Sequence, residues 1–178
     1  RRVRISNIFG AYRYYVVSFT HPDVHPGAPS VFESIVLDGI FCAKPGQAQP
    51  NPLPSDAWAR TGAPLIWAAP GTLVKELTIS HLDRVERFPG APDTIVVDEK
   101  ATVERLNISD AHVVNVTETP VSLVCNSGKI GVLNMVNVTG SAEAGNPRGF
   151  LLNDCGSIGE KHLCNVSAEN MGIESGAK

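Results

Sequence analysis

One pattern of hydrophobic and polar residues recurs six times along this chain. Leu77, Leu106 and Leu133 occupy the same place in three consecutive copies and lie 29 and 27 residues apart. Polar residues alternate with hydrophobic ones inside each copy, which is the pattern of a half-buried β-strand. A period of this length is typical of a solenoid, in which each copy forms one coil and neighbouring coils bury one another.

Aligned side by side, the six copies place hydrophobic residues in three columns that we predict to face a common core. The first column contains Val3, Ile35, Leu77, Leu106 and Leu133, with Lys161 as the exception in the last copy. The second column contains Ile5, Leu37, Ile79, Ile108, Met135 and Leu163. The third column contains Ile8, Ile40, Leu82, Ala111, Val138 and Val166.

The position just before the third column predicts a sharp corner in each coil. Its six residues are Asn7, Gly39, His81, Asp110, Asn137 and Asn165. Gly, Asn, Asp and His are the residue types enriched at positive φ. We therefore expect a left-handed residue at this corner, with stacked Asn side chains that hydrogen-bond from one coil to the next.

A second, shorter hydrophobic segment in each coil predicts a second strand, at 15–19, 65–68, 94–97, 121–124 and 150–153. Most of these segments lead through a short turn into the next copy, whereas the other connections vary and include the long Pro-rich loop 43–63. No copy has the 3.6-residue periodicity of a helix. The predicted fold is all-β, a right-handed parallel β-helix of about six coils of roughly 28 residues.

The composition excludes several functions for a protein with this fold. A net charge of −3 indicates no nucleic-acid partner, and no hydrophobic run is long enough to span a membrane. The four cysteines match no zinc-binding spacing, so we expect free, mostly buried thiols and no metal or other cofactor. Since the chain begins inside the first copy, we expect residues 1–178 to form a single β-helix domain that is part of a longer β-helix.

The repeated sequence pattern Leu-x-Ile-x-Asn-Ile/Val resembles that of the pectin-lyase-like superfamily of right-handed β-helices. The resemblance covers Val3 to Val166. That group includes pectate lyases, polygalacturonases, other glycoside hydrolases and phage tailspikes. The resemblance implies a secreted carbohydrate-active protein, located outside the cell, on its surface or in the periplasm. The Asp-Asp pair and Gly-His-Gly motif of polygalacturonases and the Trp-Ile-Asp-His motif of pectate lyases are missing from the chain. The resemblance therefore assigns no catalytic residue.

Two carboxylates are candidates for glycoside hydrolysis. Asp98 and Asp154 follow predicted short strands, in one column with Ala69 and Asn126. Two coils separate the two Asp residues, so their backbones should lie ~9–10 Å apart. Inverting glycosidases hold their carboxylates ~6.5–9.5 Å apart, which leaves room for a water molecule. The alternative is structural, because Asp and Asn also begin tight turns.

Five residues are predicted to bind the substrate. Asn126 shares the column of the two carboxylates, and Trp58 and Trp67 offer flat apolar faces to sugar rings. Arg84 and Arg87, in a predicted loop over 81–87, can bind the carboxylate of a uronate in bidentate fashion. The alternative for the two Trp residues is structural, with the aromatic side chains packing the loops against the rest of the protein. The alternative for the two Arg residues is a solvated loop with salt bridges.

We expect the protein to cleave or bind a polysaccharide or oligosaccharide, with hydrolysis favoured over β-elimination. The alternative is a non-catalytic structural or adhesive β-helix, such as a tailspike or surface-protein segment. A homo-oligomer is compatible with both. An enzyme should gather two carboxylates, or a carboxylate and a base, in one groove beside aromatic side chains. A scaffold should carry isolated charges on flat faces, and fold alone does not decide between the two.

Overall fold

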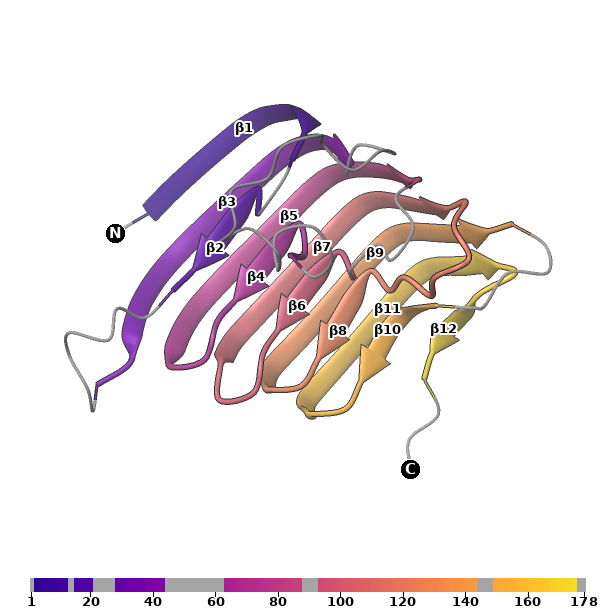
Figure 1. The fold of residues 1–178 in the computed structure, drawn as a ribbon. Coiled ribbons are helices and arrows are strands. Elements are labelled where there is room, and N and C mark those ends of the chain that lie inside the picture. Colours follow the sequence, from indigo (N-terminus) through magenta and orange to yellow (C-terminus); the bar gives the residue numbers. More distant parts are fainter. Residues whose placement is uncertain are drawn as a thin grey trace, which may run out of the picture.

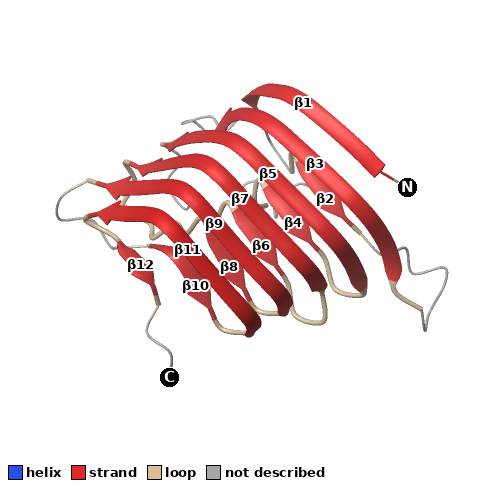
Figure 2. Ribbon diagram, turned by 180° about the vertical axis from the view of Figure 1, so that it is seen from behind, coloured by secondary structure: helices blue, strands red, loops and turns tan. Residues whose placement is uncertain are grey.

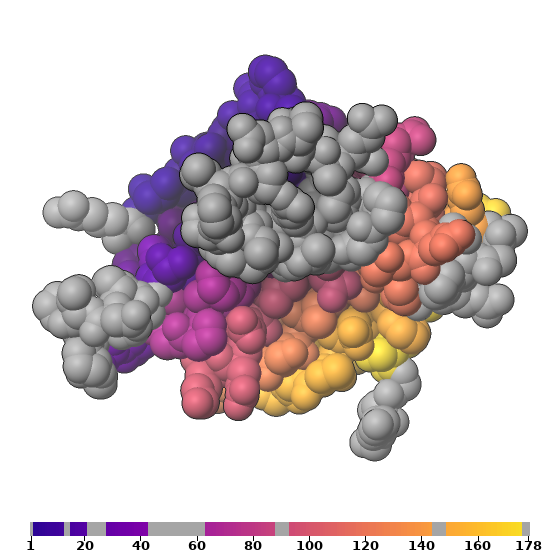
Figure 3. Space-filling model, viewed as in Figure 1, coloured from indigo at the N-terminus to yellow at the C-terminus, as the bar shows by residue number. Residues whose placement is uncertain are grey.

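The computed structural model shows a β-solenoid formed by two parallel sheets (Figures 1 and 2). It describes residues 2–12, 15–20, 28–43, 63–87, 93–143 and 149–175, and this part of the chain contains no helix. In the space-filling view of Figure 3 the coils follow one another across the molecule in chain order, from indigo to yellow. The predicted all-β, parallel β-helix is confirmed.

Each coil contributes one long and one short strand. The long sheet consists of β1 (Arg2–Ala11), β3 (Ser30–Ala43), β5 (Thr72–Glu86), β7 (Thr102–Asn115), β9 (Lys129–Ala142) and β11 (Ser157–Glu169), in that order. The short sheet consists of β2 (Val17–Phe19), β4 (Ile66–Ala68), β6 (Ile95–Val97), β8 (Val124–Asn126), β10 (Phe150–Asp154) and β12 (Gly172–Glu174), also in chain order. Because all neighbours are parallel, the chain winds in one sense throughout.

The solenoid amounts to about four turns, fewer than the six coils predicted. Five connections join the six copies. The connection from β3 to β4 passes through 44–62, which lies outside the described residues. Most of the predicted Pro-rich loop 43–63 falls in this segment. The number of strands per sheet nevertheless equals the number of copies found in the sequence.

The register of the long sheet reproduces the three predicted columns. Leu77 pairs with Leu106, and Leu106 pairs with Leu133, and the other two columns continue in the same way along the sheet. Side chains of the columns are buried in the middle copies. At the two ends, Val3 is 44% and Leu163 is 37% exposed, because an end strand has a neighbour on one side only.

The predicted left-handed corner is present in all six copies. Its φ angles lie between 51° and 72° for Asn7, Gly39, His81, Asp110, Asn137 and Asn165. The long strands run on through this corner, so each one is a single bent strand. Asn137 Nδ2 donates to Asp110 Oδ1 (3.0 Å), and Asn165 Nδ2 donates to Asn137 Oδ1 (2.9 Å). These bonds form the side-chain ladder expected between coils.

Replacing Asn137 with Ala is expected to lower the free energy of unfolding by ~1–2 kcal/mol, because a Cβ-bearing residue without a polar side chain is strained at positive φ. Both hydrogen bonds of the ladder at Asn137 are lost as well. Asn137→Gly loses the same two bonds but relieves the strain, so it should cost less. Urea unfolding of both variants measures the difference. An Ala variant at least as stable as the Gly variant would contradict a strained corner.

The short strands differ from the prediction at β8. This strand covers Val124–Asn126, whereas the sequence pattern indicated 121–124. The register pairs Asp154 with Asn126 and Asn126 with Val97. The predicted column of Ala69, Asp98, Asn126 and Asp154 is therefore wrong by one residue at its first two members. The cause is turn length, because four residues join β6 to β7 and only two join β8 to β9.

Candidate functional site

Two aromatic side chains stack on the outer side of the short sheet. The ring centroids of Tyr15 and Trp67 lie 4.9 Å apart and their planes differ by 16°. Trp67 is the middle residue of β4, and its neighbours Ile66 and Ala68 are buried, so its side chain points outward as predicted. It remains partly exposed. The pair offers a flat apolar surface at the start of the solenoid.

Asp98 adjoins this aromatic pair. Its Oδ2 accepts a hydrogen bond from Trp67 Nε1 (3.2 Å), and its Oδ1 accepts one from the backbone N–H of Glu99 (2.7 Å). Burial raises the pKa of Tyr15, and the negative charge of Asp98 raises it further. The carboxylate thus fixes the indole and lies near the phenol.

The outward row of Trp67 continues along the short sheet through smaller and more polar residues. Trp67 pairs with Val96, Val96 with Cys125, and Cys125 with Asn153. Burial, followed by the charge of Asp93, raises the pKa of Cys125 to about 12, so its thiol stays protonated at neutral pH. We call Tyr15, Trp67, Asp98, Cys125 and Asn153 the Trp67 face. It combines an aromatic platform, the carboxylate of Asp98 and the carboxamide of Asn153, and the Asp93 carboxylate lies beside Cys125.

Asp154 and Asn126 lie on the other side of the short sheet. Asn126 is fully buried, and its Nδ2 donates to Asp154 Oδ1 (2.8 Å). Asp154 Oδ1 also accepts a bond from the N–H of Gly156 (3.2 Å), which makes it a turn-forming residue. Because a shift of one residue reverses the face of a strand, Asp98 and Asp154 do not form the predicted column. Asn126, which we predicted to bind the substrate, is therefore directed into the core.

Arg84 is buried inside the solenoid, so its predicted place in an exposed loop is wrong. It belongs to β5, where alternation continues inward from Leu82 through Arg84 to Glu86. Arg84 Nη2 donates to Glu86 Oε2 (2.6 Å), and Nη1 donates to Thr94 Oγ1 (2.6 Å). Both charged side chains have no exposed surface. Burial raises the pKa of the neighbouring Tyr12 to about 12, partly offset by the charge of Arg84.

The remaining predicted binding residues lie apart from the Trp67 face or outside the described residues. Arg87 follows the end of β5 and lines a surface pocket together with Val116, Thr117, Glu118 and Thr119. Its backbone N–H donates to Glu86 Oε1 (3.0 Å). Trp58 lies in the segment that the structure does not describe.

A second polar group surrounds Asp38 on the outer side of the long sheet. Its carboxylate accepts hydrogen bonds from Arg4 Nη2 (2.7 Å) and Ser80 Oγ (2.8 Å), and lies 2.9 Å from His81 Nδ1. The bond with His81, followed by those from Ser80 and Arg4, lowers the pKa of Asp38 to about 2. In return, the pKa of His81 is raised. The group joins three adjacent coils, which is a structural role.

The described ranges contain no group of three or more His, Cys, Asp or Glu side chains placed to hold a metal ion. They also contain no helix that is long and apolar enough to cross a membrane. The cysteines in this part are all free thiols, and Cys155 and Cys164 are exposed, which differs from the mostly buried set that was predicted.

Sequence reasoning missed the role of Tyr15, although Trp67 and Asp98 were both identified. Its position at the start of a predicted strand was visible, but the stack depends on the register between β2 and β4. The alternation of inward and outward residues continues beyond the corner at His81, and this pattern in the sequence indicates that Arg84 is buried. No protein-family model, no curated protein and no solved structure matches this chain.

Proposed function

We propose that this protein binds a polysaccharide or oligosaccharide on the Trp67 face. The stacked pair of Tyr15 and Trp67, with the indole N–H held by Asp98, is the observation that carries this proposal. The C–H faces of sugar rings pack on aromatic rings, while carboxylates and carboxamides accept hydrogen bonds from sugar hydroxyls. Asp98 supplies such a group beside the apolar platform, and Asn153 supplies one three coils further along the same row.

The parallel arrangement suits an extended ligand with a repeating structure. Neighbouring coils place equivalent residues ~4.8 Å apart along the solenoid axis. The row from Trp67 through Val96 and Cys125 to Asn153 therefore runs across four coils without a break in register. A polymer chain laid along this row contacts the aromatic pair at one end and polar side chains at the other.

Membership of the pectin-lyase-like superfamily is part of the proposal and is supported by the parallel solenoid and its repeat. We also propose an extracellular, cell-surface or periplasmic location, and the proposed polysaccharide ligand is the only support for it. Exposed free thiols at Cys155 and Cys164 are more typical of a reducing compartment, because oxidising compartments favour disulfides. Determining the oxidation state of these two cysteines in the native protein therefore tests the location separately from the binding.

Cleavage is a second step of the proposal, with hydrolysis preferred to β-elimination. Asp98 is the carboxylate that adjoins the aromatic pair, whereas Asp154 shares an inward row with Asn126 and Val97. Hydrolysis by a carboxylate pair requires a partner within ~5–9.5 Å of Asp98. Release of reducing ends, compared between the protein and its Asp98→Asn variant, tests this step. Absorbance of unsaturated uronates identifies elimination instead.

Replacing Trp67 with Ala is expected to weaken binding at least ~30-fold, which is the effect of removing a contact worth ~2 kcal/mol. Calorimetry against pectins, alginates and hemicelluloses measures the affinity. Trp67→Phe keeps a ring but removes the N–H bonded to Asp98, so an intermediate loss is expected. Phe41→Ala is the control, because this exposed aromatic side chain belongs to the long sheet and should not affect binding.

A non-catalytic scaffold is the alternative function. The observation that favours it is the regular ladder of Asp110, Asn137 and Asn165, which stiffens the solenoid and leaves few free groups at the corner. If none of the polysaccharides binds, and if Trp67→Ala changes nothing, the scaffold explains the fold better than a binding protein does.

A further inference from the structure

Two carboxylates flank the outward row of the Trp67 face. Asp93 comes before β6 and Asp98 comes directly after it, and the row crosses this strand at its middle residue. Asp98 lies beside the aromatic pair, where its Oδ2 accepts the indole N–H of Trp67. Asp93 lies beside Cys125, and its Oδ1 accepts the backbone N–H of Ser122 (2.6 Å). A ligand laid along the row therefore passes between the two carboxylates.

The hydrogen bonds that hold these carboxylates leave their charge in place. Asp98 accepts from the indole of Trp67 and from the backbone N–H of Glu99, and Asp93 accepts from a backbone N–H, so all of these donors are uncharged. Within the described ranges, the ion pairs involve other carboxylates. The turn after Asp98 adds Glu99 and Lys100, both exposed, whose opposite charges offset each other. This part of the surface thus keeps a net negative charge.

The two charges act on the side chains of the row itself. Burial raises the pKa of Tyr15, and Asp98 raises it further. Burial, followed by Asp93 and more weakly by Asp98, raises the pKa of Cys125. A field that disfavours a phenolate and a thiolate at these places also disfavours an anionic ligand there and attracts a cationic one.

The arginines that were predicted to bind a uronate lie away from this face. Arg84 is inside the solenoid, where it is paired with a buried carboxylate, and Arg87 lines a pocket together with Glu118. An ionised uronate chain along the row would bring its own carboxylates close to Asp93 and Asp98, and like charges repel. Polyuronates such as pectate and alginate are therefore poor candidates for the ligand.

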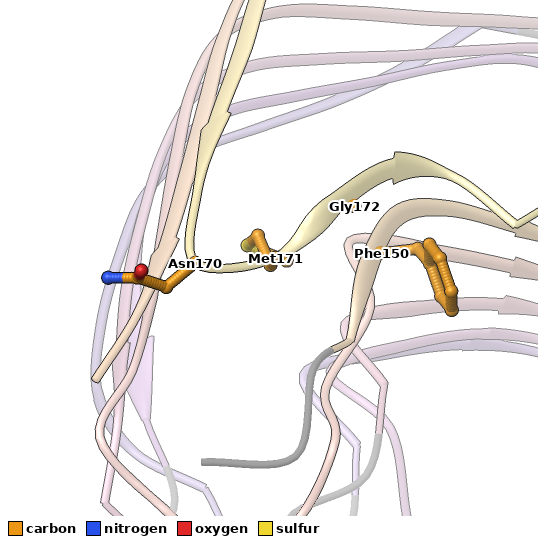
Figure 4. A pocket seen from close by; sticks show the side chains of 4 residues that line it. All are labelled: Phe150, Asn170, Met171 and Gly172. Atoms are coloured by element: carbon orange, nitrogen blue, oxygen red, sulfur yellow. The ribbon is translucent and has the colours of Figure 1, made fainter. Parts of the chain in front are cut away.

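Another surface pocket, at the turn between β11 and β12, is uncharged. Phe150, Asn170, Met171 and Gly172 line it, and Figure 4 shows Met171 directed inward and Asn170 directed away from the interior. This pocket offers no charge to a ligand, and the pocket of Arg87 offers one charge of each sign. Of these three surfaces, the Trp67 face combines aromatic rings with unbalanced negative charge.

We propose that the ligand of the Trp67 face is a polysaccharide of amino sugars, whose ammonium groups pair with Asp98 and Asp93. The sugar rings pack on Tyr15 and Trp67, and an ammonium group close to an aromatic ring gains a cation–π interaction in addition to the ion pair. Amino-sugar binding rests on the proposed function, because it narrows the ligand of the same face to a cationic polysaccharide.

The test compares two oligosaccharides of equal length, a glucosamine hexamer with ammonium groups and an N-acetylglucosamine hexamer with neutral acetamides. Calorimetry is carried out at low salt, in a weakly acidic buffer that keeps the amino groups of the ligand protonated. The glucosamine hexamer should bind at least ~5-fold more tightly, which is the effect of exposed ion pairs of this kind. A galacturonate hexamer should bind more weakly than either. Added salt should reduce the preference, because it screens exposed charges.

Variants with the same change in net charge separate a local effect from a general one. Asp98→Asn keeps the shape of the side chain and should lower the preference for the glucosamine hexamer at least ~2-fold. The double variant Asp93→Asn/Asp98→Asn should bind both hexamers equally. Asp83→Asn is the control for Asp98→Asn, because this exposed carboxylate belongs to β5 in the long sheet and should leave the preference unchanged.

The outcomes distinguish amino-sugar binding from polysaccharide binding as such. If the two hexamers bind equally well and Trp67→Ala weakens both, the face binds polysaccharides without using its charges, so the amino-sugar proposal is wrong while the proposed function stands. A preference that Asp83→Asn reduces as much as Asp98→Asn also overturns the proposal, because attraction to the whole protein then explains it. If no hexamer and no polysaccharide binds, both proposals are wrong.

Discussion

Replacing Arg84 with Ala is expected to lower the free energy of unfolding by ~3–5 kcal/mol, the largest effect that we predict for a single substitution. Arg84 and Glu86 have no exposed surface, and two nitrogens of the guanidinium donate to one carboxylate oxygen. The substitution leaves the Glu86 carboxylate buried without this cation. It also removes the hydrogen bond to Thr94. Denaturant unfolding followed by circular dichroism measures the loss.

The double variant Arg84→Met/Glu86→Leu is the matched comparison for this prediction. It removes both charges together and fills the space with apolar side chains, which is often neutral or stabilising for a buried ion pair. We therefore expect the double variant to be more stable than Arg84→Ala. If the two variants are equally unstable, the loss comes from packing around Arg84, and the uncompensated charge of Glu86 is not its cause.

Replacing Leu106 with Ala is expected to cost ~2–5 kcal/mol, because the substitution opens a cavity in a closely packed core. Leu106 is fully buried in β7, in the middle of the first column, with Leu77 and Leu133 on its two sides. Neighbouring coils are fixed by backbone hydrogen bonds, so they cannot close around the missing atoms. The melting temperature and the denaturant midpoint should both fall.

Val136→Ala serves as the control for the cavity prediction. Val136 belongs to the next long strand, β9, but its side chain points outward and is exposed. A surface substitution of this kind usually changes stability by less than ~0.5 kcal/mol. A similar loss for both variants would contradict the assignment of the first column to the core.

The three columns and the corner were predictable because they depend on residue type within one copy. Alternation assigns Leu77, Ile79 and their equivalents to the core, and small polar residues identify the left-handed position. The exception at Lys161 was visible in the same alignment. Its ion pair with Glu174 was not, because that contact joins two sheets at one end of the solenoid.

The candidate site was predictable only in part. Trp67 was expected to point outward and does so, and Asp98 was identified as a candidate but with the wrong partner. The turns from the short to the long strands are unequal, with four residues after β6 and two after β8, and this difference separates Asp98 from the predicted partner Asp154. The predicted loop over 81–87 ends the strand at the corner, whereas β5 continues through His81 to Glu86 and directs Arg84 inward.

The sequence by itself determined the parallel solenoid, its hydrophobic columns and its corners, since each follows from a short pattern repeated in every coil. Only the tertiary structure decided which polar residues meet and on which side. A difference in turn length moves Asn126 into the interior and leaves Asp98 beside Trp67. The physical reason is the two-residue period of a strand, in which a shift by one residue exchanges the core and the surface.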